Sequence, residues 1–130
     1  MTFSGPGRYA SRAFESPILR HRPMSTEPLI VLTTCGNPGQ AERLATELVE
    51  TRLAACVNAL PQTSSTYRWN GTVERAEEVV LLIKTTRERF AELEARIKLR
   101  SSYELPEVLA VRVADGSQEY LDWIRSSLEI

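Results

Sequence analysis

The pair Asn70-Gly71 lies between two β-rich segments and constrains the fold of this chain more than any other feature. Asn and Gly tolerate the positive φ angles of a type I′ turn, which joins two antiparallel strands. β-Branched and aromatic residues precede the pair, and an apolar run over residues 79–83 follows it. We therefore predict one long β-hairpin over residues 54–85.

A two-residue turn also determines the register of this hairpin. Trp69 then faces Thr72, and Tyr67 faces Glu74, so that both aromatic side chains lie on one side of the ribbon. Two strands do not bury that side by themselves. Pro61 cannot donate to a central ladder, so it predicts a bend or an edge position in the first strand of the hairpin.

Hydrophobic spacing predicts the remaining elements. Apolar runs over 29–34 and 108–113 indicate two further strands. An amphipathic helix follows Asn37, which we expect to act as its N-cap, with Pro38 in the first helical position and Gln40 reaching back as in a capping box. A second capping box over 85–88 predicts the start of another helix.

That second helix is expected to end near Leu99, and a last helix follows the turn at Asp115-Gly116-Ser117. The order β-α-β-β-α-β plus a C-terminal helix is the ferredoxin-like, split βαβ arrangement of the α+β class. Both crossover helices should cover one sheet face. The other face is then either polar or covered by another chain.

Composition and charge argue against some classes of binding partner. The 130 residues suit one domain, and the net charge is −1. Residues 1–27 carry four Arg against two Glu, so the remainder carries 12 basic and 15 acidic residues. A mildly acidic body argues against nucleic-acid binding. No apolar run approaches the roughly 20 residues that span a bilayer, so a membrane protein is not expected.

The chain divides into a tail over residues 1–27 and one domain over 28–130. The tail contains Gly, Pro, Ser and Arg and lacks the apolar run of a secretory signal. It is either an organellar transit peptide, a disordered tail, or the product of a start codon upstream of a natural start at Met24. We favour the last two, because the ordered pattern begins only after Met24.

Two cysteines, Cys35 and Cys56, are too few for a disulfide framework. They belong to parallel strands separated by a third strand, and we expect them at opposite ends of the sheet. Disulfide geometry requires Cα atoms within roughly 7 Å, so no intrachain bond is predicted. Reduced thiols indicate a reducing compartment, and a cytoplasmic location is expected.

Five motifs in order then resemble one known family. They are LAAC-x-N at 53–58, Tyr67-x-Trp69-x-Gly71, Lys84-Thr85-Thr86, Tyr103-Glu104-x-Pro106-Glu107 and Tyr120-Leu121-x-Trp123. Together with the segments between them, they make residues 29–127 resemble the CutA family of divalent-cation tolerance proteins.

This resemblance implies a homotrimer of ferredoxin-like subunits, similar in architecture to the PII signalling proteins, with hairpins that extend the sheets of neighbouring copies. It also implies a role in tolerance of copper and other divalent ions by metal binding, without catalysis. The alternative is a PII-like regulatory or scaffold trimer that binds a small anionic ligand or an unknown protein partner.

Three residues are candidate ligands of a divalent ion such as Cu²⁺. Cys35 offers a thiol, and Glu104 and Glu107 offer carboxylate oxygens. The family loop commonly has His where this chain has Ser101, and the only histidine is His21 in the tail. The competing interpretation is that Cys35 is a plain buried thiol and that Glu107 forms an ion pair.

A ligand or interface cleft is also predicted, with Lys84, Tyr103, Tyr67 and Trp69 around it. Lys84 stands beside a predicted helix N-terminus, where backbone N–H groups favour an anion. The aromatic residues are more simply explained as packing groups at a contact between copies. A catalytic triad would need a histidine in the body of the chain, so we do not expect an enzyme.

Overall fold

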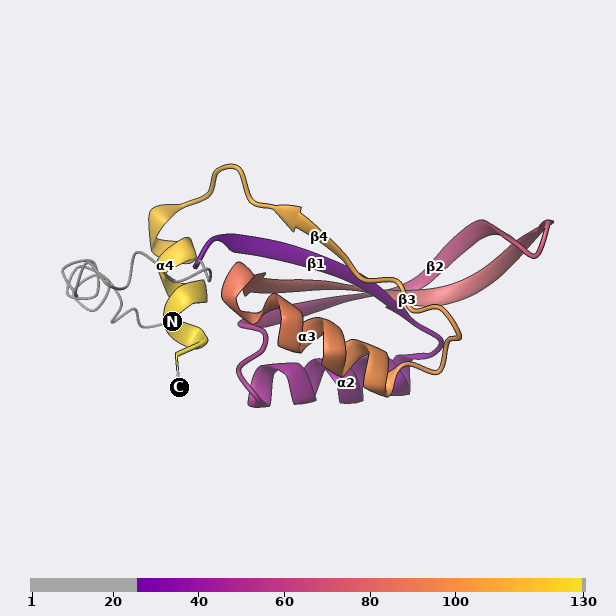
Figure 1. The fold of residues 1–130 in the computed structure, drawn as a ribbon, viewed down its shortest axis with the longest axis horizontal. Coiled ribbons are helices and arrows are strands. Elements are labelled where there is room, and N and C mark those ends of the chain that lie inside the picture. Colours follow the sequence, from indigo (N-terminus) through magenta and orange to yellow (C-terminus); the bar gives the residue numbers. More distant parts are fainter. Residues whose placement is uncertain (1–25, 130) are drawn as a thin grey trace.

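The computed structural model describes residues 26–129, which form the sheet and helices of Figure 1. The elements are β1 (Pro28–Cys35), α2 (Pro38–Glu50), β2 (Cys56–Trp69), β3 (Thr72–Thr86), α3 (Arg87–Arg100), β4 (Leu109–Arg112) and α4 (Gln118–Ser127). The predicted order of strands and helices is confirmed. The prediction of a tail over residues 1–27 concerns residues that lie almost wholly outside the described part of the chain.

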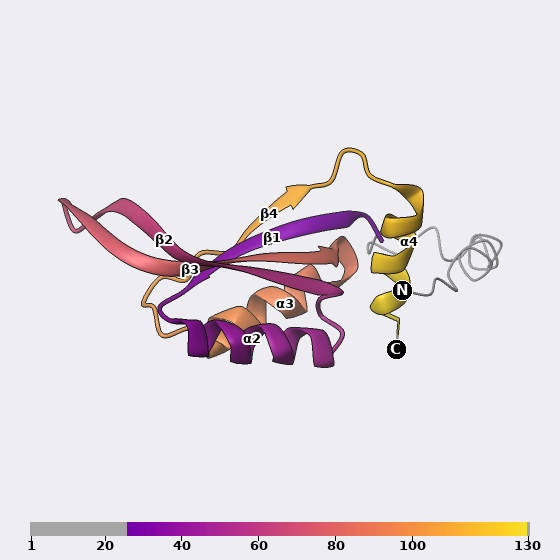
Figure 2. The ribbon, with the colours of Figure 1, turned by 180° about the vertical axis from the view of Figure 1, so that it is seen from behind.

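The four strands form one antiparallel sheet in the order β2-β3-β1-β4. β1 is therefore an interior strand, as predicted. Helices α2 and α3 lie side by side along the same face of the sheet in both views (Figures 1 and 2). The ferredoxin-like prediction is confirmed, and the opposite sheet face carries neither helix.

The core lies between the sheet and these two helices. Alternate residues of β1 and β3 point toward the helices because successive side chains of a strand alternate between faces. Val31, Leu81 and Ile83 have no exposed surface. They pack with residues of α2, α3 and the segment between α2 and β2, including Leu44, Leu48, Leu53, Leu93 and Ile97. The amphipathic spacing of α2 and α3 thus correctly predicted that both helices pack against the sheet.

The N-terminus of α2 agrees with its predicted cap. Asn37 has an extended backbone, and its side-chain oxygen accepts a hydrogen bond of 2.9 Å from the Gln40 N–H, with Pro38 at the first helical position. The side-chain oxygen of Gln40 instead lies 3.5 Å from the Ser102 hydroxyl.

The predicted capping box of α3 is wrong. Thr86, not Thr85, is the N-cap, and its side chain makes no capping hydrogen bond. Thr85 still belongs to β3, where it is fully buried and its hydroxyl donates to the Leu53 carbonyl at 2.7 Å. The hydrogen bond to the buried Leu53 carbonyl stabilises the fold more than a side-chain cap would, because water can bond to the free N–H groups of the helix N-terminus instead.

The hairpin has the predicted turn and register. Trp69 pairs with Thr72 and Tyr67 pairs with Glu74. Asn70 and Gly71 have φ angles of 50° and 80°, as a type I′ turn requires. The bend predicted near Pro61 is also confirmed, because the register of the edge strand β2 shifts between Leu60 and Thr63.

The sheet face turned away from α2 and α3, which we call the open face, carries an apolar patch. β1 contributes Ile30 and Leu32, β3 contributes Val80 and Leu82, and the edge strands contribute Leu60, Leu109 and Val111. Leu60, Leu109 and Val111 are 43%, 57% and 50% exposed. The register also places Asn58, Glu78 and Lys84 on this face, so the face is mixed, with apolar side chains at its centre.

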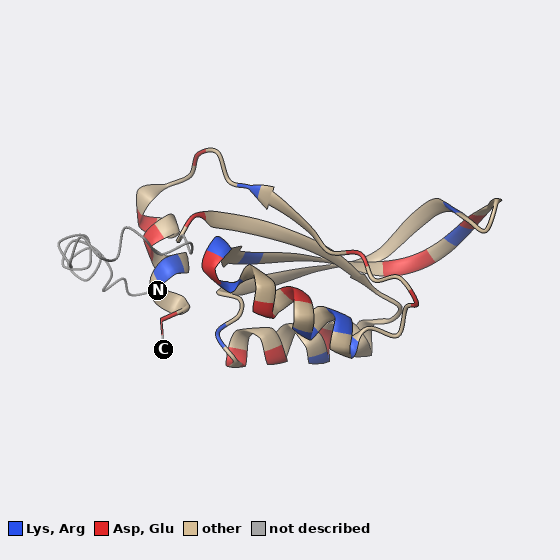
Figure 3. Cartoon of the chain, in the orientation of Figure 1, with Lys and Arg blue, Asp and Glu red and all other residues tan. Residues whose placement is uncertain are grey.

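Helix α4 packs at the end of the sheet where β1 begins (Figure 1). Arg52 donates to the Ser127 carbonyl at 3.1 Å, and Arg89 donates to the Leu128 carbonyl. These cations stabilise the negative end of the helix dipole. Figure 3 shows other charged residues along α2, α3 and the hairpin, while β1 carries none. No helix within residues 26–129 is long and apolar enough to cross a membrane.

Candidate metal and ligand site at the base of the hairpin

A groove lies on the open face, between the hairpin and the loop that follows α3. We call it the hairpin groove, and its volume is about 750 Å³. It is lined by Thr34, Ser65, Thr66, Tyr67, Arg68, Trp69, Glu74, Glu78, Ser102, Tyr103, Glu104, Leu105 and Glu107. The two-residue alternation of β2 and β3 places Tyr67 and Glu74 on this side.

Five of the seven residues predicted for a site line this groove. Tyr67 and Trp69 come from β2, and Tyr103, Glu104 and Glu107 come from the loop after α3. These two segments are more than 30 residues apart in the chain, and the sheet brings them together. The groove thus brings two of the predicted metal ligands, Glu104 and Glu107, next to three residues predicted for a separate cleft.

The sequence reasoning did not single out Glu78, whose carboxylate is the best-connected acid of the groove. Burial opposes its charge, but hydrogen bonds from Ser65, Tyr103 and Thr34 outweigh burial, and the pKa of Glu78 lies below its ordinary value of 4.5. The available signal was the alternation in β3, which puts Glu78 on the same face as Glu74 and Leu82.

Tyr103 joins the loop to this network. Burial first, and then hydrogen bonding to the Glu78 carboxylate, raise the pKa of Tyr103 well above its ordinary value of 10. The phenol is therefore a neutral hydrogen-bond donor at neutral pH. The Tyr103 N–H also donates to the Ser101 hydroxyl at 3.0 Å, which stabilises the local conformation of the loop.

The lining of the groove carries four glutamates and one arginine, so its field favours cations. Within residues 26–129 there is no group of three or more His, Cys, Asp or Glu side chains placed to hold a metal ion. Carboxylates such as Glu104 and Glu107 suit a divalent ion that keeps water or takes ligands from elsewhere. The available ligand atoms are mostly carboxylate oxygens, and such a set fits weak binding of a divalent ion.

Cys35 and Lys84 lie outside the groove. Cys35 is 7% exposed and faces the helix side of the sheet, where burial and then the charge of Glu78 raise the pKa of its thiol. It is therefore a protonated thiol at neutral pH. The Lys84 amine lies at the other end of β3, 5.7 Å from the centre of the Tyr120 ring and 3.9 Å from the Cys56 sulfur.

The ferredoxin-like sheet, the long hairpin and the acidic groove define a small α+β protein with one uncovered sheet face and a cation-attracting cleft. Residues 29–127 match the family described as CutA1 divalent ion tolerance protein. The chain belongs to this family. CutA proteins are not enzymes, which confirms the prediction of a non-catalytic protein.

Relatives come from bacteria and plants. The divalent-cation tolerance protein CutA of Thermus thermophilus is 45% identical over 98 residues, which cover 75% of this chain and 95% of that protein. The chloroplastic CutA of Arabidopsis thaliana is 35% identical over 121 residues, covering 92% of this chain and 66% of that protein.

Solved structures agree with the fold. The crystal structure of CutA from Xylella fastidiosa has a TM-score of 0.77 and 40% identity, and the match covers 79% of this chain and 99% of that one. The structure of the Thermus thermophilus protein has a TM-score of 0.75, with 77% of this chain and 97% of that one covered.

Proposed function

We propose that this CutA protein acts in tolerance of divalent metal ions, with Cu²⁺ as the leading candidate, by binding them in the hairpin groove. The observation that carries this proposal is the gathering of four glutamates around one cleft. Glu104 and Glu107 are the proposed ligands, and Glu74 adds negative charge. Cys35 stays a predicted ligand, although it lies on the other side of the sheet.

We also propose that the protein is a homotrimer, as the resemblance to the CutA family implies. The open face supports this, because half-exposed apolar side chains such as Leu109 and Val111 gain stability when another copy covers them. The strands β2 and β4 are both sheet edges with unpaired backbone groups. A neighbouring copy beside the groove would supply ligands that a single copy lacks.

A cytoplasmic location is part of this proposal. It rests on the two free cysteines, Cys35 and Cys56. Relatives carry other locations in their names: the Arabidopsis protein is chloroplastic, and the solved CutA of Archaeoglobus fulgidus is described as periplasmic. Fractionation of native cells, with mass spectrometry of the N-terminus, decides between these compartments.

Calorimetric titration with Cu²⁺ and with Zn²⁺ tests the metal site. We expect saturable binding with a Kd on the order of 10⁻⁴ M, because few carboxylates and solvent water compete for the ion. The double variant Glu104→Gln and Glu107→Gln should weaken it about tenfold or more. A Cys35→Ala variant tests the thiol separately.

The matched control is the double variant Glu42→Gln and Glu92→Gln, which removes two exposed carboxylates from α2 and α3. It carries the same change in net charge and should bind like wild type. Equal affinity in both double variants would assign binding to general charge attraction and contradict the groove. Absence of saturable binding in wild type would contradict metal binding altogether.

A further inference from the structure

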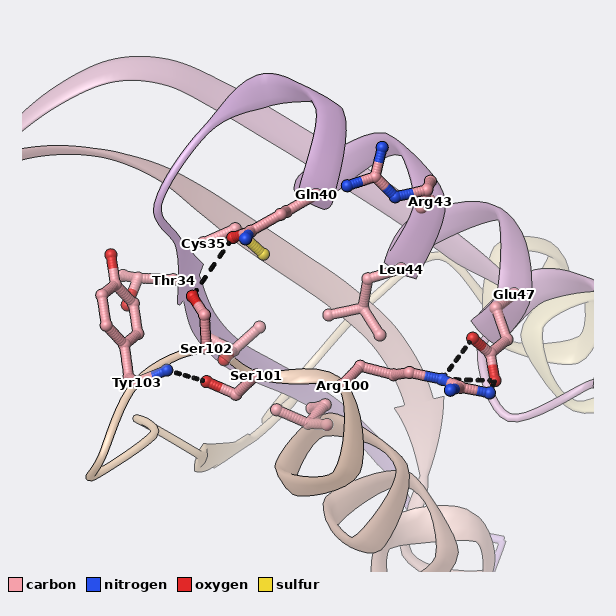
Figure 4. A pocket seen from close by; sticks show the side chains of 12 residues that line it. Thr34, Cys35, Gln40, Arg43, Leu44, Glu47, Arg100, Ser101, Ser102 and Tyr103 are labelled. Carbon is pink, nitrogen blue, oxygen red and sulfur yellow. Dashed lines mark hydrogen bonds and ion pairs between the residues drawn. The ribbon is translucent and has the colours of Figure 1, made fainter.

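A second cavity lies on the helix side of the sheet, between the first half of α2 and the loop that follows α3 (Figure 4). We call it the α2–α3 pocket, and its volume is about 330 Å³. That volume is at the lower end of the range for small-molecule sites. Tyr103 lines both this pocket and the hairpin groove and stands between them.

The wall of the pocket includes the hydroxyl group of Thr33. Thr33 is 1% exposed. Because Thr33 lines the pocket, its hydroxyl can donate or accept a hydrogen bond with a bound molecule. Leu44 and Ile97 supply apolar surface beside it.

The rim of the pocket carries excess positive charge. Glu47 accepts hydrogen bonds from Arg100 Nε at 2.9 Å and from Arg96 Nη1 at 2.7 Å. The hydrogen bond from Arg100 is the largest cause that keeps the pKa of Glu47 below its ordinary value, so this one carboxylate remains charged and is shared by two cations.

Arg43, also on the lining, forms no ion pair within residues 26–129. Arg100 uses its Nε and Nη2 for Glu47, which leaves its Nη1 disengaged from that carboxylate. Figure 4 shows Arg43 on the α2 side and Arg100 on the α3 side of the pocket, with Leu44 between them and with Gln40 and Ser102 farther left, toward Tyr103. The rim thus has free N–H donors and net positive charge, which favour a carboxylate.

We propose that the α2–α3 pocket binds a small organic carboxylate that carries a hydroxyl at its other end. The carboxylate lies at the rim with Arg43 and Arg100, the short aliphatic part contacts Leu44 and Ile97, and the hydroxyl bonds to Thr33. The pocket uses none of the proposed metal ligands of the groove other than Cys35 on its wall. Its occupancy is therefore independent of an ion held by Glu104 and Glu107.

NMR titration of the full chain, labelled with ¹⁵N, tests this with 5-hydroxypentanoate as the probe. We expect saturable shifts of the amides around Gln40, Cys35 and Ser102. The uncharged analogue 1,5-pentanediol has the same length and should bind about tenfold more weakly, because it lacks the charge that the arginines recognise.

Two variants assign the contacts. Thr33→Val keeps the shape of the side chain and removes its hydroxyl, and Arg43→Gln removes an exposed charge without touching the core. Each should weaken binding of 5-hydroxypentanoate about tenfold. Arg75→Gln, an equal charge change on the exposed hairpin, should bind like wild type.

The proposal is overturned if wild type shows no saturable shift below roughly 10 mM probe. It is also overturned if the shifts map to the hairpin groove, or if Arg43→Gln and Arg75→Gln bind equally. A dispersed amide spectrum would show that the Thr33→Val variant is folded. If Thr33→Val does not fold, the result for Arg43→Gln decides the test. Titration of the same samples with Cu²⁺ measures metal binding in the hairpin groove independently.

Discussion

Glu78 shows how one side chain can organise a site. The β1 residue Thr34, the β2 residue Ser65 and the loop residue Tyr103 all stabilise its charged form and so lower its pKa. Three segments of the chain therefore meet at one charge. We infer that Glu78 positions the groove, whereas Glu104 and Glu107 are exposed and remain available to an ion.

Replacing Glu78 by Gln should lower the free energy of unfolding at pH 7 by about 1 kcal/mol, because hydrogen bonds to a charged acceptor are weakened. The pKa of Glu78 is lower in the folded protein than its ordinary 4.5. Its contribution is therefore complete above pH 4.5 and is lost as the pH falls through the folded pKa. Urea unfolding at pH 7 and at several values below 4.5 measures both effects.

Glu77→Gln is the control for this prediction. Glu77 is the preceding residue of β3, is exposed, and points to the other side of the hairpin. Its variant should unfold like wild type at every pH, at the same protein concentration. If the two variants showed the same stability and pH dependence, the Glu78 network would have no energetic role.

At the scale of elements, the hairpin depends on its two turn residues. Gly71 has a φ angle of 80°, and a Cβ added there would meet no atom within 4 Å. Any cost of a side chain is therefore conformational and not steric crowding by neighbours. Beyond the bulge at Leu60–Thr63, the two hairpin strands pair only with each other among the described strands.

Gly71→Ala should destabilise the arm by about 1 kcal/mol, because an L-residue is strained in the left-handed region. Amide hydrogen exchange at the hairpin should then rise about fivefold, while exchange in the core strands is unchanged. Asn70→Gly, which suits its φ angle of 50°, should leave exchange near the wild-type rate. Unchanged protection in Gly71→Ala would mean that contacts outside the turn hold the arm.

At the scale of the whole molecule, the open face is the largest feature that one copy leaves uncovered. Its apolar residues come from all four strands, so the exposed surface is continuous across the sheet. Helix α4 packs only at the end where β1 begins. Covering the rest is the proposed role of two further copies.

Light scattering should give a trimer mass for wild type and a smaller mass for Leu82→Glu. Leu82 lies half-buried on the open face, and a charge there would be buried without a partner in an assembly. Leu99→Glu is the matched control, since Leu99 is 69% exposed on α3 and should leave the mass unchanged. A wild-type monomer at micromolar concentration would contradict the trimer.

Local features of the sequence predicted most of the fold. The hairpin turn, its register and the cap at Asn37 depend on neighbours within a few residues, and all three are confirmed. The capping box at Thr85 failed because a buried carbonyl 32 residues away competes for the hydroxyl. Local sequence propensity contains no information about this distant carbonyl.

For the candidate site, residue types and their order predicted a metal site at Cys35, Glu104 and Glu107 and a separate cleft at Lys84, Tyr103, Tyr67 and Trp69. They left Glu78 out and grouped Cys35 and Lys84 with residues on other parts of the sheet. Distances between segments depend on strand order and on the side of the sheet to which each residue points. A set of motifs read along the chain does not contain those distances.

By itself, then, the sequence determined the order of elements, the hairpin turn and the family resemblance, because each depends on short-range geometry or on residue identity. Only the tertiary structure decided which groups meet. It placed Glu78 beside Tyr103, put the Thr33 hydroxyl on the wall of a pocket that Arg43 and Arg100 also line, and left apolar side chains half-exposed on the open face. The physical reason is that burial and charge pairing arise between segments that are distant in the chain and adjacent in space.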